Sequence, residues 1–348
     1  MSKKQKFNKP QHQRSVKSSP ELILKESAFP LKNIQILLIL AFSFLLYANT
    51  VSFDYTLDDA IVITDNKFTQ KGFEGIKDIL TKDTFFGFFG ENKQLVSGGR
   101  YRPLSLVTFA IEYEFFGKNP LVSHFINILL YAVTGILLLL MLYQLFPNSL
   151  ISFFNVPFLA SMLFIGHPLH TEVVANIKGR DEIMCFLGLL GMIYFLNRYL
   201  EKKQLPHLLL SLLIYFLALM SKENAITFLA LVPLFLYFFT NEKIKRILIL
   251  SSIYLIPAVI FWSLRGYLTK SSVTMEVTEV LNNPFVYMTA IQKYATVVFT
   301  WGKYLLLLIF PHPLTHDYYY NQITPKAFTD ITVILVILIH LGLAYIAL

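Results

Sequence analysis

The run LVSHFINILLYAVTGILLLLMLYQLF, residues 121–146, contains no Asp, Glu, Lys or Arg. An α-helix needs roughly 20 apolar residues to cross the hydrocarbon core of a bilayer, and this run exceeds that length. The composition of the whole chain agrees, because 55% of its 348 residues are hydrophobic and only 15% are charged. A soluble domain carries about 25% charged residues. The sequence therefore predicts an all-α polytopic membrane protein.

Other apolar runs predict a bundle of roughly eight or nine transmembrane helices. Leu104–Phe116 is too short to span and carries Glu112 and Glu114, so we expect it at the interface or against the bundle. The predicted crossings besides residues 121–146 are Ile34–Ala48 (a retained signal anchor), Phe153–Ile165, Ile183–Leu200, Leu208–Met220, Ala225–Thr240, Ile247–Leu264, a tilted or interfacial Pro284–Phe310, and Ile331–Leu348.

The distribution of basic residues predicts the orientation of this bundle. Residues 1–32 hold eight Lys and Arg against two Glu, so they supply six of the formal net charge of +8. We expect them to form a disordered basic cytoplasmic tail near anionic lipid, and we do not expect nucleic-acid binding. Arg198–His207 and Asn241–Arg246 each hold three basic residues and one Glu, which places them inside by the positive-inside rule.

Little in the sequence identifies the compartment. Cys185 is the single cysteine, so no intrachain disulfide is possible. The chain has no Asn-x-Ser/Thr acceptor sequence, which favours a bacterial cytoplasmic (inner) membrane over a eukaryotic lumen.

Phe53–Pro103 is a long polar loop between the first two apolar runs. It holds eight acidic and seven basic residues, too many to lie in hydrocarbon. Its length also exceeds that of a simple connection between neighbouring helices. We therefore predict a large first extracytoplasmic loop with interfacial helices over residues 53–120, followed by the remaining transmembrane bundle.

Polar residues gather at the predicted outer ends of the helices, whereas the inner turns are short. This asymmetry is expected for a site that opens at the outer leaflet. Several members also have structural explanations: Asp181 suits the positive end of a helix, and Arg100 and Arg102 suit snorkelling towards lipid phosphates. The outer clusters are Asp58-Asp59, Arg100 with Arg102, residues 167–172, residues 178–182, residues 221–224, and Arg265.

An ordered set of motifs runs through these clusters: Asp58-Asp59 after the first helix, Tyr101-Arg102-Pro103-Leu104 with Phe109, Ser123 to Asn127, His167 to Glu172, Gly179-Arg180-Asp181, Lys222-Glu223, Asn283-Pro284, and Pro311 with Asp317-Tyr318. Over about residues 34–325 this set resembles the transmembrane and tetratricopeptide repeat-containing O-mannosyltransferases and their bacterial relatives, within the GT-C glycosyltransferases. The family usually has Gly-Arg-Ala-Asp and Lys-Glu-Gln at two of these motifs, and its C-terminal repeats are absent here.

The resemblance implies a GT-C-like transmembrane domain over residues 33–348 and a metal-independent glycosyltransferase. Such an enzyme moves a sugar, with inversion, from a polyprenyl-phosphate carrier to a hydroxyl on the outer face. The implied partners are this lipid donor, an acceptor that is a protein Ser/Thr or a glycan, and membrane lipid. No cofactor is implied, and His167 with His170 lacks a third metal ligand in the sequence.

The chemistry assigns roles to the polar residues. A carboxylate is needed as general base, and the sequence gives only a narrow preference for Asp58 over Asp59. The leaving phosphate is a weak base, so it needs cations and no general acid. The candidate phosphate-binding residues are Arg100, Arg102, Arg180 and Lys222. The candidate substrate-lining residues are His167, His170, Glu172, Asp181, Glu223, Asp317 and Tyr318.

Other functions stay open at this point. The acceptor can be a lipid or a glycan in place of a protein. A transporter is disfavoured because transporters place charges at mid-membrane, whereas these helix centres are apolar. A non-catalytic scaffold is the third alternative. Because no polar residues follow Ile331–Leu348, we expect the chain to be truncated or a fragment.

Overall fold

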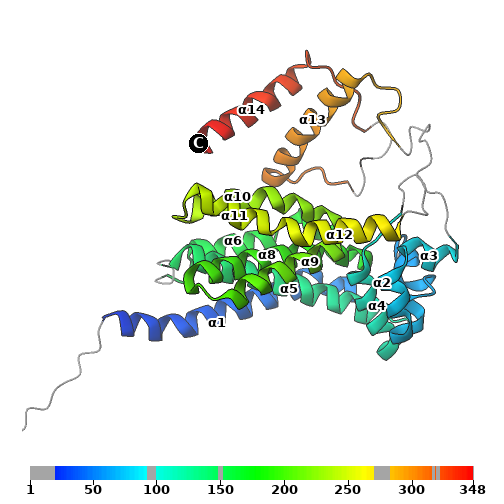
Figure 1. Cartoon of the computed structure of the whole chain (residues 1–348), viewed down its shortest axis with the longest axis horizontal. Coiled ribbons are helices and arrows are strands. Elements are labelled where there is room, and N and C mark those ends of the chain that lie inside the picture. Colours follow the sequence, from blue (N-terminus) through cyan, green and yellow to red (C-terminus); the bar gives the residue numbers. More distant parts are fainter. Residues whose placement is uncertain are drawn as a thin grey trace, which may run out of the picture.

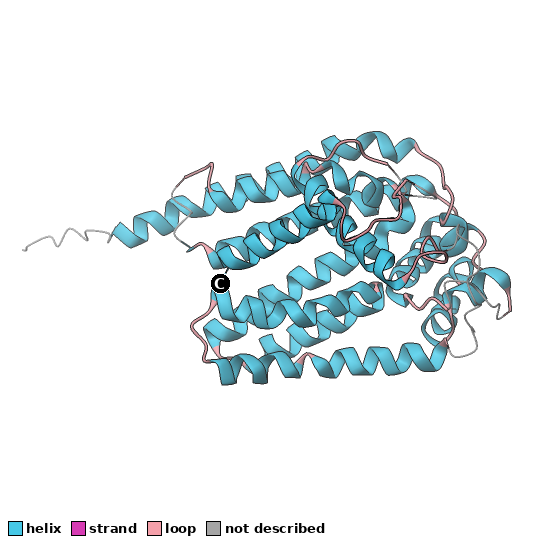
Figure 2. Ribbon diagram, turned by 90° about the horizontal axis from the view of Figure 1, so that it is seen from above, coloured by secondary structure: helices cyan, strands magenta, loops and turns pink. Residues whose placement is uncertain are grey.

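The computed structural model describes residues 20–91, 99–147, 152–269, 283–315, 318 and 322–347. In this part of the chain every regular element is helical (Figure 1). The predicted all-α class is confirmed. Figures 1 and 2 show the long helices lying roughly side by side, with short helices gathered at one end of the bundle.

Within the described residues, four helical segments are long and apolar enough to cross a membrane: Leu31–Ser52, Pro120–Leu145, Ile177–Lys202 and Ile244–Leu268. A fifth arises if Val156–Ile165 and Pro168–Ala175, which meet at 45°, form one broken span. These helices support the predicted membrane protein.

The helices follow the predicted apolar runs with shifted ends. Pro120, Pro157 and Pro206 each lie in a first helical turn, where the missing amide hydrogen is not needed. The α-helices are α1 (Pro20–Tyr47), α2 (Ile76–Thr81), α3 (Thr84–Phe89), α4 (Pro103–Phe116), α5 (Pro120–Leu145), α6 (Val156–Ile165), α7 (Thr171–Ala175), α8 (Arg180–Lys202), α9 (Leu205–Ser221), α10 (Phe228–Phe239), α11 (Ile244–Ile253), α12 (Leu255–Leu268), α13 (Ala290–Ile309) and α14 (Ile331–Ala347).

The first helix begins at Pro20, inside the segment predicted to be a disordered tail. The stretch from Pro20 to Lys32 is rich in Leu, Glu and Lys, which favour helix, and it opens with proline at the first helical position.

The centre of the bundle is the pair α8 and α9, with α5 packed against α8 and α1 against α5. Gly188 makes the first of these contacts close, because a Cβ there would lie 2.8 Å from the Cβ of Ala218. Small residues let membrane helices approach in this way. One large core cluster joins α8 and α9 to α10–α12, and a second joins α1, α5 and α6.

The first loop forms a folded unit at one end of the bundle (Figure 1). A third core cluster joins its residues, including Val62, Phe68 and Ile79, to the buried face of α4. Asn66 organises the turns: its Nδ2 donates to the carbonyls of Ile61 (2.9 Å) and Thr84 (3.2 Å). This unit fixes the approach of the chain to α4, and so the position of Arg100 and Arg102.

Candidate active site

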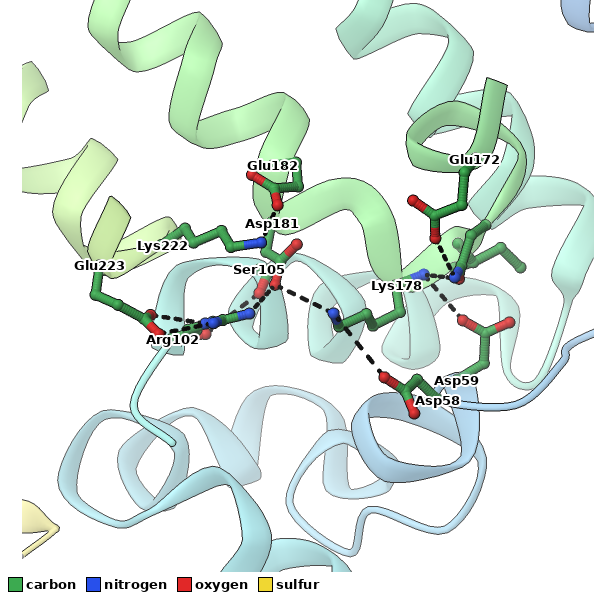
Figure 3. A network of polar contacts seen from close by, with 12 residues as sticks. Asp58, Asp59, Arg102, Ser105, Glu172, Lys178, Asp181, Glu182, Lys222 and Glu223 are labelled. Carbon is green, nitrogen blue, oxygen red and sulfur yellow. Dashed lines mark hydrogen bonds and ion pairs between the residues drawn. The ribbon is translucent and has the colours of Figure 1, made fainter. Parts of the chain in front are cut away.

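Arg102 lies just before α4 and meets carboxylates from two other elements (Figure 3). Its Nη1 donates to Asp181 Oδ2 at 2.7 Å. Its Nε and Nη2 donate to the two oxygens of Glu223 at 2.8 and 2.7 Å, a bidentate pair. Burial opposes the charge on Arg102, but the bonds that it donates to Glu223 and Asp181 raise the pKa of the guanidinium above its ordinary value. Arg102 therefore ties the first loop to the starts of α8 and of the Glu223–Thr227 turn.

Lys178 extends this chain of alternating charges towards the first loop. Its Nζ lies 3.9 Å from Asp181 Oδ2 and 4.0 Å from Asp58 Oδ2. These separations exceed hydrogen-bonding distance, so the ammonium is shared between the two carboxylates. Figure 3 shows the resulting row from Glu223 through Arg102, Asp181 and Lys178 to Asp58. Four segments distant in sequence meet here, as the clustering at the outer ends predicted.

Asp58 and Asp59 have opposite environments. The Asp59 side chain is buried, and its oxygens accept hydrogen bonds from the amides of Thr56 (2.8 Å) and Lys178 (2.9 Å). Burial raises the pKa of Asp59, and these two bonds oppose the rise. The Asp58 side chain is 49% exposed. Leu57, immediately before it, has φ 42°, a strained conformation for a residue with a Cβ and one that recurs at functional sites.

Arg180, a candidate phosphate-binding residue in the sequence, lies inside the protein and is bonded to protein groups. It is fully buried, stacks 4.1 Å over Phe109 and pairs with Glu112. Its Nε donates to Asn127 (2.7 Å) and its Nη2 to the Ser123 carbonyl (2.9 Å). All three of its nitrogens therefore have partners within the protein. This arrangement argues against direct contact of Arg180 with a donor phosphate and gives it a structural position behind the site.

Lys222 and Arg100, also predicted to bind phosphate, differ in whether a carboxylate already pairs with them. Lys222 forms an ion pair with Glu182. Arg100 lies 4.9 Å over the Phe85 ring, and its buried Nη1 has no hydrogen-bond partner among the described residues. Burial and the neighbouring Arg102 lower the pKa of Arg100. Arg100 is thus the less neutralised of the two cations.

The predicted substrate-lining histidines lie behind this row of charges. His170 Nδ1 is 2.7 Å from the Tyr131 hydroxyl, and His170 lines a cavity of about 210 Å³ together with Glu182, Phe164 and Phe186. His167 Nε2 is 3.1 Å from the Leu308 carbonyl.

The remaining predicted residues do not join the row. Glu172 is exposed and accepts a bond from Asn176 at 3.1 Å. Tyr318 lies near α13, its ring 5.8 Å from Lys303 Nζ. Asp317 lies outside the described residues. Among the residues that the structure describes, no group of three or more His, Cys, Asp or Glu side chains could hold a metal ion.

Lys178 and Glu112 were not among the predicted site residues. Lys178 before Gly179 reads from the sequence as an ordinary helix end. Glu112 is a charge within an otherwise apolar run, which predicts a buried partner of opposite sign but does not say which one. Their partners lie 119 residues (Asp59 to the Lys178 amide) and 68 residues (Arg180) away in the chain.

Residues 103–265, from α4 through most of α12, match the family described as dolichyl-phosphate-mannose-protein mannosyltransferase. The chain resembles protein O-mannosyltransferases, as its motifs predicted. Over 194 residues it is 29% identical to "Protein O-mannosyl-transferase F38B6.6" of Caenorhabditis elegans, covering 55% of this chain and 26% of that relative. Over 195 residues it is 32% identical to "Protein O-mannosyl-transferase Tmtc1" of Drosophila melanogaster, covering 55% and 21%.

The human "Protein O-mannosyl-transferase TMTC1" is 32% identical over 197 residues, covering 53% of this chain and 21% of the relative. The alignment thus spans about a quarter or less of the length of these curated relatives. No solved structure matches this chain. The segment that matches the family model covers the positions of Lys178, Asp181 and Glu223, whereas Asp58 and Arg102 precede it.

Proposed function

We propose that this protein is an integral-membrane glycosyltransferase. It moves a sugar from a polyprenyl-phosphate donor to a hydroxyl, in the first instance a protein Ser or Thr. The similarity to proteins named O-mannosyl-transferases supports the sugar and protein classes. The observation that carries the proposal is the half-exposed Asp58 at the end of a row of mostly buried charges.

In the proposed reaction, Asp58 is the general base. The acceptor oxygen attacks the anomeric carbon, its proton passes to the Asp58 carboxylate, and the bond from the anomeric carbon to the phosphate oxygen breaks with inversion. The polyprenyl phosphate leaves with the bonding electrons. Asp59 is less suited to this role because both of its oxygens are occupied by backbone amides in a buried position. We assign Asp59 to holding Asp58 in place.

The cations then divide into two groups. Arg100, whose Nη1 has no hydrogen-bond partner in the described part of the chain, is the proposed direct contact to the donor phosphate. Arg102 orients Asp181 and Glu223, and Lys222 and Glu182 neutralise each other at the edge of the site. His170 and Glu182 line the neighbouring cavity, so we propose that the cavity belongs to the substrate path.

We propose that the site faces outward, with the N-terminus and the turns at 198–207 and 241–246 in the cytoplasm of a bacterial cell. The basic residues of these turns support this orientation. If Leu205–Ser221, Glu223–Phe239 and Ile331–Ala347 also cross, the bundle approaches the predicted eight or nine spans.

The proposed function is tested by transfer from a polyprenyl-phosphate sugar to an acceptor peptide with the purified full chain in lipid. Asp58→Asn keeps the shape but loses the proton acceptor, so turnover should fall roughly 10²–10⁴-fold. Asp54→Asn is the matched control, since Asp54 is an exposed acid of the same loop. Equal turnover of the Asp58→Asn variant and the unmodified protein would remove the base assignment. Transfer only to a lipid or glycan would change the acceptor class, and no transfer to any acceptor would favour a non-catalytic role.

A further inference from the structure

Arg265, in the last turn of α12, is a second incompletely bonded guanidinium near the proposed site. It lies 5.3 Å over the ring of Trp262, much as Arg100 lies over Phe85. Its Nε is buried and, among the described residues, has no hydrogen-bond partner. A buried donor without an acceptor is unfavourable, so such a group either carries a local strain or awaits a ligand.

Arg265 and Arg100 belong to adjoining pieces of backbone. A Cβ on Gly99 would lie 2.7 Å from the Cβ of Thr269, so the residue before Arg100 touches the end of α12. The same hypothetical atom would lie 2.4 Å from Asp83 Oδ2. Both arginines interact electrostatically with Asp83, yet among the described residues that Oδ2 has no hydrogen-bond partner. Asp83 therefore balances part of the charge of both guanidinium groups.

The charges around Arg265 connect it to the row described above. Arg265 interacts electrostatically with Glu223, and Arg100 with Asp58, Asp181 and Glu223. The cations within the row already have carboxylate partners: Arg102 bonds to Asp181 and Glu223, and Lys178 is shared between Asp181 and Asp58. Beside the row, Lys222 is paired with Glu182. Among the lysines and arginines in the described part of the chain, Arg100 and Arg265 are the two that have a buried side-chain nitrogen without a hydrogen-bond partner.

We propose that Arg265 and Arg100 together bind the phosphate oxygens of the lipid-linked donor. This inference rests on the proposed function and adds a residue from α12 to the phosphate subsite. Guanidinium groups suit phosphate because their planar donors can form two parallel charge-assisted bonds. Stacking on Trp262 and Phe85 holds both groups before the ligand arrives. Because the two arginines come from the first loop and from α12, one phosphate between them would link these elements.

Trp262 provides a direct reporter of binding. The chain has two tryptophans, so a Trp301→Phe background leaves Trp262 alone beside Arg265. The full chain in detergent is titrated with polyprenyl phosphate, with the matching polyprenol as uncharged control. Phosphatidylglycerol tests whether any anionic lipid headgroup binds at this site. Inorganic phosphate tests whether a free phosphate is enough. We expect a saturable change in Trp262 emission with polyprenyl phosphate, at a midpoint well below those of the other three.

Arg265→Ala and Arg100→Ala should each raise that midpoint roughly 10- to 100-fold, the range for loss of a charge-assisted hydrogen bond. Arg100→Ala leaves the Arg265–Trp262 pair intact, so its effect cannot come from a damaged reporter. Arg265→Lys should recover part of the affinity. Arg246→Ala is the matched control and should change nothing, because Arg246 pairs with Glu242 in the 241–246 turn.

The outcomes separate this inference from the proposed function. Unchanged midpoints in both alanine variants would overturn the inference, even if sugar transfer is observed. Equal midpoints for polyprenyl phosphate and phosphatidylglycerol would also overturn it, because the site would then recognise any anionic lipid. Arginine-dependent binding in a protein that transfers no sugar would support the phosphate subsite and reject the glycosyltransferase proposal.

Discussion

Removing the Glu112 carboxylate should destabilise the whole bundle, because it leaves the buried Arg180 guanidinium without its counter-charge. Arg180 has no exposed surface, and Glu112 accepts from both of its terminal nitrogens. In Glu112→Ala the bonds from Arg180 to Asn127 and Ser123 remain, but the charge is uncompensated. Breaking a buried pair in this way costs about 3–5 kcal/mol. Glu112→Gln keeps one acceptor and should cost less, about 1.5–3 kcal/mol.

Cys185 makes this prediction measurable. It is the only cysteine of the chain, it is buried in α8, and it lies little more than one helical turn beyond Arg180. A thiol-reactive fluorophore therefore reports opening of the bundle around the pair during thermal or SDS-induced unfolding of the purified chain. Glu114→Gln, an exposed acid on the same helix, should change stability by about 0.5 kcal/mol or less.

A double variant tests the physical cause. Glu112→Leu with Arg180→Met removes both charges and fills their space with apolar groups, so it should recover most of the stability lost in Glu112→Ala. Wild-type stability of Glu112→Ala would refute the reasoning outright. A double variant as unstable as Glu112→Ala would show that the loss comes from the surrounding hydrogen bonds to Asn127 and Ser123, and not from an uncompensated charge.

Three further expectations follow from the site. In a background without the native cysteine, a cysteine at the exposed Glu172 should react with an impermeant maleimide in intact cells and one at Lys243 should not; the reverse labelling would invert the topology. Arg102→Lys should lose the bidentate bond to Glu223 and retain only part of the transfer activity, so full activity would contradict its orienting role. Burial raises the pKa of Asp59, so folding favours its protonated form and stability should fall as pH rises from the ordinary Asp range through the folded value; in Asp59→Asn this decrease in unfolding free energy should be absent.

The sequence predicts the helical class, the folded first loop and the gathering of polar groups on one side. These properties depend on runs of residues, since apolar length and charge position are averaged over many side chains. The start of α1 is less well predicted, because polarity alone reads Pro20–Lys32 as tail although its residues favour helix. The residue at which a helix begins depends on the helix propensities of individual residues and on whether the adjoining residues are already helical. The overall composition of a segment does not contain this information.

The roles of single residues were harder to predict, and Arg180 explains why. An arginine that opens an apolar helix after a glycine has the same sequence signature whether it faces a ligand or a buried carboxylate. The difference comes from Glu112 on α4, whose approach is set by the packing of α4 on the first loop. Asp58 and Asp59 present the same difficulty, since the burial of Asp59 and its bonds from the Thr56 and Lys178 amides arise from the fold and not from the local sequence.

The pairing of these charges has a consequence for how the site recognises an anion. Arg102 and Arg180, the arginines within the most recognisable motifs, are bonded to carboxylates and hold α4, α8 and the Glu223 turn together. Among the described residues, Arg100 and Arg265 have no such carboxylate pair, and each keeps a buried nitrogen without a hydrogen-bond partner. A donor phosphate that entered the paired row would have to displace a carboxylate from an ideal bidentate geometry, whereas at Arg100 and Arg265 it would supply acceptors that are missing. Electrostatic complementarity therefore favours phosphate binding beside the row, where the first loop meets the end of α12, with the row serving to assemble the elements around it.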